Sequence, residues 1–293
     1  MTVFVQQLLN GVVNGSVYCL IGIGITLVFG LTGLVNFAHG EFMMVGAYLV
    51  LLIGTGLNPW VALVAGVFVA FVVVGGAGVI LEKALFSRTI NRPINGFIVS
   101  LGLVLVLQNV VAMHWGTNPQ VVQAPLQTTV LHIGSIDFPA MRIVVLGVAL
   151  ILSAGFYAFL NRTRVGTALR CCNVDRDTAT LMGINVPRMQ SLAFGVGSAL
   201  AGTGGVLLAM IYTFNPFFGA TIVVKGFVIA LAGGIGNVAG AFYAGILFGI
   251  CEALTVQFGL GAWSGAITFG FIIAVLLVRP SGLFAGSHGS AVT

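Results

Sequence analysis

Few side chains in this sequence could take part in acid–base, nucleophilic or metal chemistry, and the densest group of them lies between two long apolar runs. Asn36, His39 and Glu41 stand close together within residues 30–41. The stretch has a single histidine and no zinc-binding H-E-x-x-H motif follows, so we predict no metal site. Polar groups between apolar segments usually face a cavity or the interior of a helix bundle. We therefore interpret these three residues as candidates to line a solute pathway; an ordinary turn with polar helix caps is the alternative.

The sequence also lacks the motifs by which enzymes and nucleotide-binding proteins are recognised. Its two lysines, Lys83 and Lys225, stand outside any G-x-x-x-x-G-K-[ST] motif, and no G-x-S-x-G motif occurs. The glycine-rich run at 233–240 lacks the spacing of a dinucleotide-binding loop, and its small-x-x-x-small pairs are typical of close helix packing. We expect a protein that is not an enzyme, has no catalytic residues and binds no cofactor.

The composition indicates which elements must hold these residues. Of 293 residues, 59% are hydrophobic and only 6% are charged, whereas soluble domains carry about 25% charged residues. Continuous apolar runs of about 20 residues predict membrane-spanning helices rather than the strands of a barrel. We predict an all-α polytopic transmembrane helix bundle, a single domain over residues 1–293, with about eight or nine membrane segments. Their expected ranges are 5–29, 41–54, 60–81, 94–113, 140–160, 189–212, 222–236, 238–257 and 263–279.

The basic residues set the orientation of these segments. Three of them share the loop between the third and fourth segments, and five arginines lie in the loop 161–188. Loops rich in Lys and Arg stay on the cytoplasmic side, so both loops are predicted to be cytoplasmic. The loop 114–139 is then outside, as is the N-terminus if the segment 41–54 crosses fully. Because most of the basic residues lie in these loops, the net charge of +5 does not indicate nucleic-acid binding.

Two short stretches indicate an internal repeat. Asn36 to Gly40 and Asn215 to Gly219 both read Asn-x-x-x-Gly, and each precedes a short apolar segment. The predicted topology puts the first stretch near the cytoplasm and the second near the outside. This opposite placement is what a weak inverted repeat with broken helices would give; chance similarity between glycine-rich stretches is the alternative. Asn215 is therefore a further candidate for the pathway.

Two charged residues are placed inside membrane segments and are predicted to form an ion pair. Lys225 lies about four residues inside the outer end of one expected helix, and Glu252 lies about five residues inside the outer end of the next. An unpaired charge at that depth costs about 2–3 kcal/mol on insertion scales. Pairing would offset much of this cost, whereas a lysine that reaches outward to the interface is the alternative. Glu41 is the other acidic residue within an expected segment.

The loop 161–188 is expected to be folded. Asp175 can cap a short helix, Asp177 is favourable in the first turn of that helix, and Gly183 is a typical C-terminal stop. An ordered loop of about 28 residues between otherwise short connections is typical of a docking element. A solvated amphipathic hairpin without a partner is the alternative.

Several motifs in matching order, from about residue 5 to 285, are specific when they are taken together. They are Gly33-Leu34-Val35-Asn36-Phe37-Ala38-His39-Gly40-Glu41, Arg164-x-Gly166-x-x-x-Arg170, Ala179-x-x-x-Gly183-Ile184-Asn185, Leu231-Ala232-Gly233-Gly234-Ile235-Gly236-Asn237 and Arg279-Pro280-Ser281-Gly282-Leu283. With these motifs the chain resembles the high-affinity branched-chain amino acid ABC importer permeases, and in particular the first of their two permease subunits.

The resemblance implies a subunit of an importer in the bacterial inner membrane. Its implied partners are a second homologous permease, two ABC ATPase subunits that hydrolyse ATP, and a periplasmic solute-binding protein. The loop 161–188 would couple to an ATPase through these candidate residues: Arg170, Asp175, Asp177, Ala179, Gly183 and Asn185. The implied solute is a branched-chain or other neutral amino acid. Urea, short amides or another small polar solute are alternatives within the same broad family, and a passive small-solute channel is a more distant one.

Overall fold

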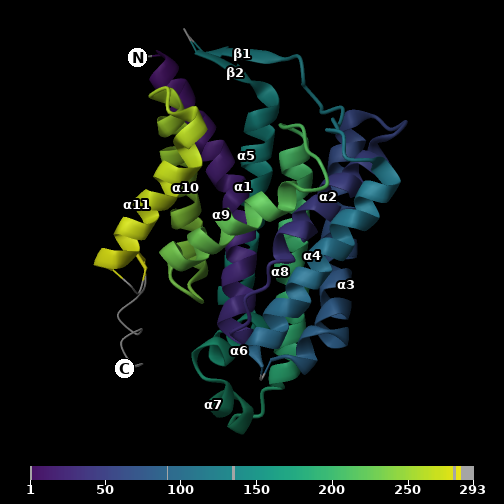
Figure 1. Ribbon diagram of the computed structural model, residues 1–293, viewed down its shortest axis with the longest axis vertical. Coiled ribbons are helices and arrows are strands. Elements are labelled where there is room, and N and C mark those ends of the chain that lie inside the picture. The colour runs from purple at the N-terminus through teal and green to yellow at the C-terminus, as the bar shows by residue number, and fades with distance from the viewer. Residues whose placement is uncertain (1, 91, 134–135, 280–281, 285–293) are drawn as a thin grey trace.

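The computed structural model describes residues 2–90, 92–133, 136–279 and 282–284, and most of them are helical (Figure 1). In chain order the α-helices are α1 (Thr2–Thr32), α2 (His39–Gly54), α3 (Pro59–Ala84), α4 (Pro93–Trp115), α5 (Ala140–Arg162), α6 (Arg164–Val174), α7 (Arg176–Leu181), α8 (Val186–Ala209), α9 (Phe218–Gly233), α10 (Val238–Gln257) and α11 (Ser264–Val278). Two 3-10 helices, η1 (Phe86–Arg88) and η2 (Gly261–Trp263), and an antiparallel hairpin of β1 (Val130–Ile133) and β2 (Ile136–Pro139) complete the described elements.

Long apolar runs account for the helices. Among the residues described, α1, α3, α4, α5, α8 and α10 are long and apolar enough to cross a membrane. The helices α2 and α9 have 16 residues each, about 24 Å at 1.5 Å per residue, which is less than the roughly 30 Å of a bilayer core. The predicted all-helical polytopic bundle is confirmed. The predicted eight or nine segments correspond to the long helices together with the shorter α2, α9 and α11.

The two ends of the bundle are different. The hairpin β1–β2 lies at one end, and α6 and α7 lie at the other (Figure 1). Because α6 and α7 belong to the arginine-rich loop 161–188, the positive-inside rule makes theirs the cytoplasmic end. We refer to the hairpin end as the outer end. The helix α1 begins there and runs toward the cytoplasmic end.

The helices are arranged as an inverted repeat. Adding 179 to the residue numbers of α2 gives the bounds of α9, and the same shift converts Asn58, the N-cap of α3, into Asn237, the N-cap of α10. In Figure 1, α2 runs toward the outer end whereas α9 runs toward the cytoplasmic end. The helix α1 packs on α10 and, correspondingly, α3 packs on α8. The similarity of two five-residue stretches therefore extends over successive helices in opposite orientation.

Glycines permit the closest helix contacts in the bundle. Gly11 and Gly15 of α1 face α10, and a Cβ atom at either position would lie 2.8 Å from a backbone atom of α10. Such close backbone approach is typical of helix pairs in membranes. Among the long helices, α1 and α8 are the most buried and form the centre of the bundle. Of the two short helices, α2 packs mainly on α8 and α9 packs mainly on α1, and α2 and α9 also contact each other.

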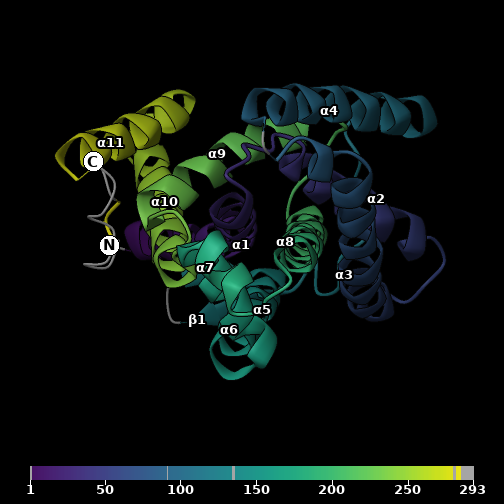
Figure 2. The same ribbon diagram turned by 90° about the horizontal axis from the view of Figure 1, so that it is seen from below.

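One side of the bundle is formed by α9 with α4 and α11 on either side of it (Figure 2). We refer to this side as the α9 face. The helices α5 and α6 lie on the opposite side. In contrast to α1 and α8, α4 leaves most of its side chains exposed. The α9 face is therefore bordered by helix surface that this chain does not itself cover.

Two predicted segment boundaries are wrong in a way that matters for the site. The helix α9 begins at Phe218 rather than at 222, because Asn215 forms the turn that starts it. The helix α3 continues to Ala84, past the predicted end at 81, and buries Glu82. Ser191 of α8 donates a hydrogen bond to Glu82. An acidic residue outside the expected segment thus lies inside the bundle.

Candidate functional site

Both helix breaks are built by the same side-chain turn. Asn36 Oδ1 accepts a hydrogen bond from the backbone N–H of Ala38 at 3.0 Å, and Asn215 Oδ1 accepts one from the backbone N–H of Phe217 at 3.0 Å. Asparagine favours such turns because its short side chain reaches the backbone two residues on. Each half-helix begins at the residue after the donor. The two Asn-x-x-x-Gly stretches therefore start α2 and α9 with the same local geometry.

The two half-helices meet at their first turns. Gly40 and Gly219 are the second residues of α2 and α9, and a Cβ atom on Gly219 would lie 2.7 Å from the carbonyl oxygen of Gly40. A side chain has no room there. Helix N-termini carry partial positive charge, and two of them converge at this point. Glu41 reaches the same place, since its Oε2 atom lies 2.9 Å from the Cβ position of Gly219. A carboxylate is electrostatically favourable beside two helix N-termini.

Asn36, His39 and Glu41 are brought together at this junction and are buried in it. Neither ring nitrogen of His39 has a hydrogen-bond partner among the described residues. Glu41 Oε1 accepts a hydrogen bond from Gln108 Nε2 of α4 at 2.8 Å, and no local pattern in the sequence reveals that partner. The cavity beside Asn36 and His39 is too small for a water molecule. Within this chain the three residues are buried close to the junction of α2 and α9, and their place on the pathway stays a prediction.

A second polar group joins α1, α9 and α10. Lys225 Nζ lies 2.5 Å from Glu252 Oε1 and 3.0 Å from the hydroxyl oxygen of Tyr18. The side chains of Lys225 and Glu252 are 13% and 17% exposed. Glu252 Oε2 is buried and has no partner among the described residues. The structure thus brings the two predicted residues into contact. It adds Tyr18, which stands 207 residues before Lys225 and carries no local signal for this role.

A pocket of about 480 Å³, here called the outer pocket, lies between α1, α8 and α9. It is lined by Tyr18, Leu208, Tyr212, Thr213, Asn215, Phe217, Phe218, Thr221 and Ile222. The Tyr212 hydroxyl donates a hydrogen bond to Asn14 Oδ1 at 2.8 Å, and the guanidinium carbon of Arg142 lies 5.6 Å from the centre of the Tyr212 ring. The predicted pathway residue Asn215 therefore stands in the wall of a cavity large enough for a small solute.

The ion pair lies next to the outer pocket, although neither of its residues lines it. Lys225 is one helical turn beyond Thr221 on α9, so the two side chains are on the same face of that helix. Tyr18 lines the pocket and also contacts Lys225 Nζ. The Lys225 ammonium additionally lies 4.8 Å from the centre of the Tyr18 ring, an arrangement in which the ring stabilises the cation. Tyr18 therefore separates the charged pair from the pocket above it.

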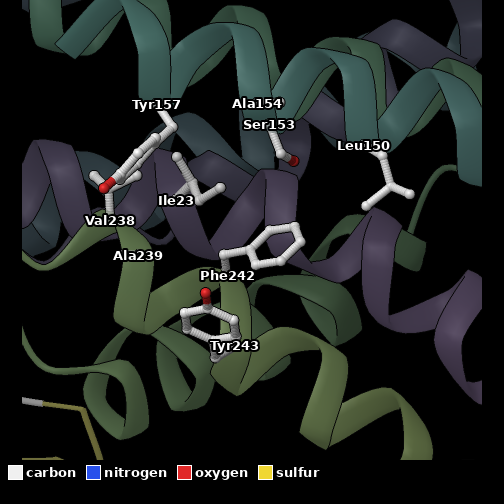
Figure 3. Close-up of a pocket in the computed structure, with 9 residues that line it drawn as sticks. All are labelled: Ile23, Leu150, Ser153, Ala154, Tyr157, Val238, Ala239, Phe242 and Tyr243. Atoms are coloured by element: carbon white, nitrogen blue, oxygen red, sulfur yellow. The ribbon is translucent and has the colours of Figure 1, made fainter. Parts of the chain in front are cut away.

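A different pocket of about 340 Å³ lies between α1, α5 and α10. Figure 3 shows the residues that line it: Ile23, Leu150, Ser153, Ala154, Tyr157, Val238, Ala239, Phe242 and Tyr243. The lining is mostly apolar, and its polar side-chain groups are the hydroxyls of Ser153, Tyr157 and Tyr243. No charged side chain lines it, and α5 stands away from the α9 face (Figure 2). This pocket has the character of a crevice that faces lipid.

The cytoplasmic helices α6 and α7 form a hairpin with well-defined ends. Asp175 Oδ1 accepts hydrogen bonds from the backbone N–H groups of Asp177 and Thr178, at 2.9 and 3.1 Å, and Oδ2 accepts one from the Thr178 hydroxyl at 2.6 Å. The hydrogen bond from the Thr178 hydroxyl, and then those from the backbone, hold the pKa of Asp175 below its ordinary value. Gly183, with φ of +80°, ends α7, and its N–H donates to the carbonyl oxygen of Thr180 at 2.9 Å.

The tip of the hairpin presents apolar side chains at the cytoplasmic end. Val174 and Leu181 are each 87% exposed, and Met182 is 79% exposed. Exposed apolar groups that lie together mark contacts with proteins or membranes. The predicted coupling residues divide into three groups. Arg170, Asp175 and Ala179 line a cavity of about 600 Å³ beside the tip. Asp177 is exposed in the first turn of α7, and Gly183 and Asn185 fix the end of α7 and the start of α8.

One contact that the sequence did not reveal ties this hairpin to α9. Asn173 of α6 donates a hydrogen bond from Nδ2 to the carbonyl oxygen of Gly236, at 3.4 Å, in the turn between α9 and α10. The amide lies between Gly30 of α1 and Gly236, where a Cβ atom at either glycine would collide with it. The N–H of Gly236 in turn donates to Thr26 Oγ1 at 3.2 Å. Asn173 therefore links α6 to the turn that ends α9.

Short helices that meet inside a membrane bundle, next to a pocket lined by both apolar and polar side chains, are typical of transport proteins. Among the residues described, no group of three His, Cys, Asp or Glu side chains could hold a metal ion. The model of the family described as the branched-chain amino acid transport system / permease component matches residues 7–276. The chain belongs to this family and is a multi-pass inner-membrane protein.

Similar proteins are known from several organisms. The high-affinity branched-chain amino acid transport system permease protein LivH of Escherichia coli (strain K12) is 34% identical, over 96% of this chain and 95% of its own length. The corresponding permease protein BraD of Pseudomonas aeruginosa is 33% identical, over 96% of this chain and 95% of its own length. The permease protein LivM of E. coli (strain K12) is 26% identical, over 91% of this chain and 67% of its own length. No solved structure matches the chain significantly.

Proposed function

We propose that this chain is the permease subunit of an ABC importer that carries branched-chain or other neutral amino acids across the inner membrane. The observation that carries the proposal is the family match over residues 7–276, joined to relatives such as LivH that are named for branched-chain amino acid transport. Because the sequence has no P-loop motif, ATP hydrolysis is assigned to partner ATPase subunits. The chain would act as one permease domain and would leave its solute chemically unchanged.

The α6–α7 hairpin is the proposed docking element for an ATPase. Its exposed apolar tip lies at the cytoplasmic end, where a partner would cover it. Asp175 and Gly183 would hold α7 in its docking orientation, because they fix the two ends of that short helix. Arg170 and Asp177, which are exposed beside the tip, would supply charged groups to the same interface.

Asn173 would carry movement of the docked hairpin to α9. Its amide contacts Gly236 in the turn that ends α9, and Thr26 of α1 holds the same turn from the other side. Because residue 236 is a glycine, the Asn173 amide contacts the backbone of the turn directly. A shift of α6 driven by nucleotide binding in the ATPase would therefore be passed to α9, the half-helix that carries Lys225.

The α9 face is the proposed wall of the pathway. The outer pocket lies on the outer side of α9. On the cytoplasmic side, the Phe37 ring packs 5.5 Å from the Phe97 ring and 5.3 Å from the Phe227 ring, measured between ring centres. These three rings would close the pathway toward the cytoplasm. A second permease of the same family, of which LivM is an example in another organism, would cover the exposed α9 face and complete the pathway.

The junction at Gly40 and Gly219 is the proposed hinge for alternating access. Half-helices can tilt at such a junction without breaking their own hydrogen bonds, and Asn36, His39 and Glu41 would hold the junction in each position. A periplasmic solute-binding protein would deliver the solute at the outer end, where the hairpin β1–β2 stands. The cycle would alternate between a state open to the outer pocket and a state open past the three phenylalanines.

The test is ATP hydrolysis by the assembled complex in lipid vesicles. The complex would contain this chain, its second permease and its ATPases, with the solute-binding protein added in the presence of L-leucine, L-isoleucine, urea or acetamide. We expect the neutral amino acids to stimulate hydrolysis and urea and acetamide to have no effect. Stimulation by urea or acetamide alone would support the small-amide alternative, and hydrolysis that no solute changes would contradict solute-coupled import.

A further inference from the structure

The ion pair beside the outer pocket has hydrogen-bonding capacity that the described residues do not use. An ammonium group has three donors, and Lys225 Nζ contacts two acceptors, Glu252 Oε1 and the hydroxyl oxygen of Tyr18. Glu252 Oε2 is buried without any partner among the described residues. A buried carboxylate oxygen that lacks a partner is costly. A ligand that supplies a donor to Glu252 and an acceptor to Lys225 would remove that cost.

We propose that Lys225 and Glu252 bind the two charged ends of a zwitterionic α-amino acid, the carboxylate on Lys225 and the ammonium on Glu252 Oε2. The proposal rests on the import function proposed above and adds the site and its ligand chemistry. The bound solute completes a ring of four alternating charges, so no net charge is added to a poorly solvated site. The solute carboxylate takes the position on Lys225 that the Tyr18 hydroxyl occupies, and Tyr18 moves aside to admit it.

The rest of the outer pocket suits an apolar side chain. Leu208, Phe217, Phe218 and Ile222 supply apolar side chains to its wall, and Tyr18, Tyr212, Thr213, Asn215 and Thr221 supply polar groups. Its volume of about 480 Å³ is within the range of small-ligand sites, about 300–1,000 Å³. Small-ligand sites combine a mostly apolar wall with a few polar groups that fix orientation. An amino acid with an apolar side chain fits this combination, whereas urea or a short amide has no charged group to offer to Lys225 or to Glu252.

The experiment measures protection of a cysteine in the outer pocket from a small water-soluble thiol reagent. The chain carries Thr221→Cys, with its four free cysteines replaced by alanine, in membranes of cells that express the complete importer. Three ligands are compared: L-leucine, L-leucinamide, which lacks the carboxylate, and 4-methylpentanoate, which lacks the ammonium. Leucine is expected to protect at a concentration at least about tenfold lower than either analogue, because each analogue loses one charge-assisted hydrogen bond. Equal protection by all three would overturn the proposal.

Charge-removing variants assign each end of the solute to its residue. In Lys225→Met, the ratio of the protecting concentration of leucinamide to that of leucine should fall below about twofold. In Glu252→Gln, the advantage of leucine over 4-methylpentanoate should fall in the same way. Glu82→Gln is the matched control, because Glu82 is also a buried glutamate but contacts Ser191 at the α3–α8 contact, and it should keep both advantages. If a charge variant does not fold, the comparison of the three ligands in the chain with Lys225 and Glu252 intact still tests the proposal.

The outcome separates the site from the import function. ATP-dependent leucine uptake by the same cells, together with equal protection by the three ligands, would refute the site and leave the importer intact. Selective protection by leucine without uptake of any neutral amino acid would support the site and contradict import by this chain.

Discussion

Replacing Gly219 with alanine is expected to force the two half-helices apart. The new Cβ atom would lie 2.7 Å from the carbonyl oxygen of Gly40 and 2.9 Å from Glu41 Oε2, whereas ordinary contacts begin at 3.4 Å. The first of these atoms belongs to the backbone of α2 and cannot rotate away as the end of a side chain can. A shift of about 0.7 Å between α2 and α9 is needed to restore 3.4 Å. That shift disturbs the hinge on which the proposed mechanism depends.

The size of the effect follows from two opposing terms. Overpacking of this kind costs about 1–3 kcal/mol, while alanine favours a helix over glycine by up to about 1 kcal/mol. Gly102→Ala is the matched control, because Gly102 lies in α4 and no other group comes within 4 Å of its Cβ position. Both variants gain helix propensity. The difference between them therefore isolates the steric cost and should be about 1–3 kcal/mol, with Gly219→Ala the less stable.

Unfolding of each purified variant in mixed micelles, by titration with a denaturing detergent, measures that difference. Leucine uptake by cells that express the complete importer measures the functional consequence. We expect Gly219→Ala to lower both stability and uptake relative to Gly102→Ala. If the two variants are equally stable, contact between Gly40 and Gly219 does not set the position of α9, and the reasoning is refuted.

Three further predictions concern the hairpin and the ion pair. Gly183→Val should abolish uptake while membrane insertion persists, because valine disfavours φ of +80°; normal uptake would remove the case for the hairpin. Lys225→Met and Glu252→Gln should each destabilise the purified chain, and the double variant should recover part of that loss; strictly additive losses would mean that the contact contributes no stability. The hydrogen bonds of the Asp175 cap lower the pKa of its carboxyl group, so the cap is intact above the ordinary pKa of Asp and is lost only as the pH falls through the lowered value. Protonation of Asp175 should therefore not change uptake between about pH 5 and 8. Uptake measured over this pH range, for Asp175→Asn and for the unchanged chain, checks this prediction.

Features that depend on nearby residues could be predicted from the sequence. Continuous apolar runs specify the helices because a lipid-embedded backbone must satisfy its own hydrogen bonds. The caps at Asp175 and Gly183 follow from local chemistry that neighbouring residues do not override. The repeat was detectable from two asparagine turns because both turns use the same side-chain hydrogen bond, which requires that residue type.

Contacts between distant segments could not be predicted in the same way. Tyr18 stands beside Lys225 only because α1 and α9 cross, and Gln108 reaches Glu41 from another helix. Asn173 contacts Gly236, which lies 63 residues further along the chain, and no local pattern in the sequence indicates this contact. The hairpin β1–β2 has strands of four residues each, which are too short for a clear alternating pattern. The predicted depth of Lys225 within its membrane segment is also wrong. Because α9 begins four residues earlier than predicted, Lys225 is the eighth residue of this helix rather than the fourth.

The central claim is that this chain forms the pathway of an ATP-driven importer for neutral amino acids. The most direct measurement is accumulation of radiolabelled L-leucine by vesicles that contain the assembled complex, with ATP on the ATPase side and the loaded solute-binding protein on the other. The account predicts accumulation against a concentration gradient, and its loss when ATP is replaced by a non-hydrolysable analogue. Equilibration of leucine to the same level with and without ATP would contradict the account and would identify a passive channel.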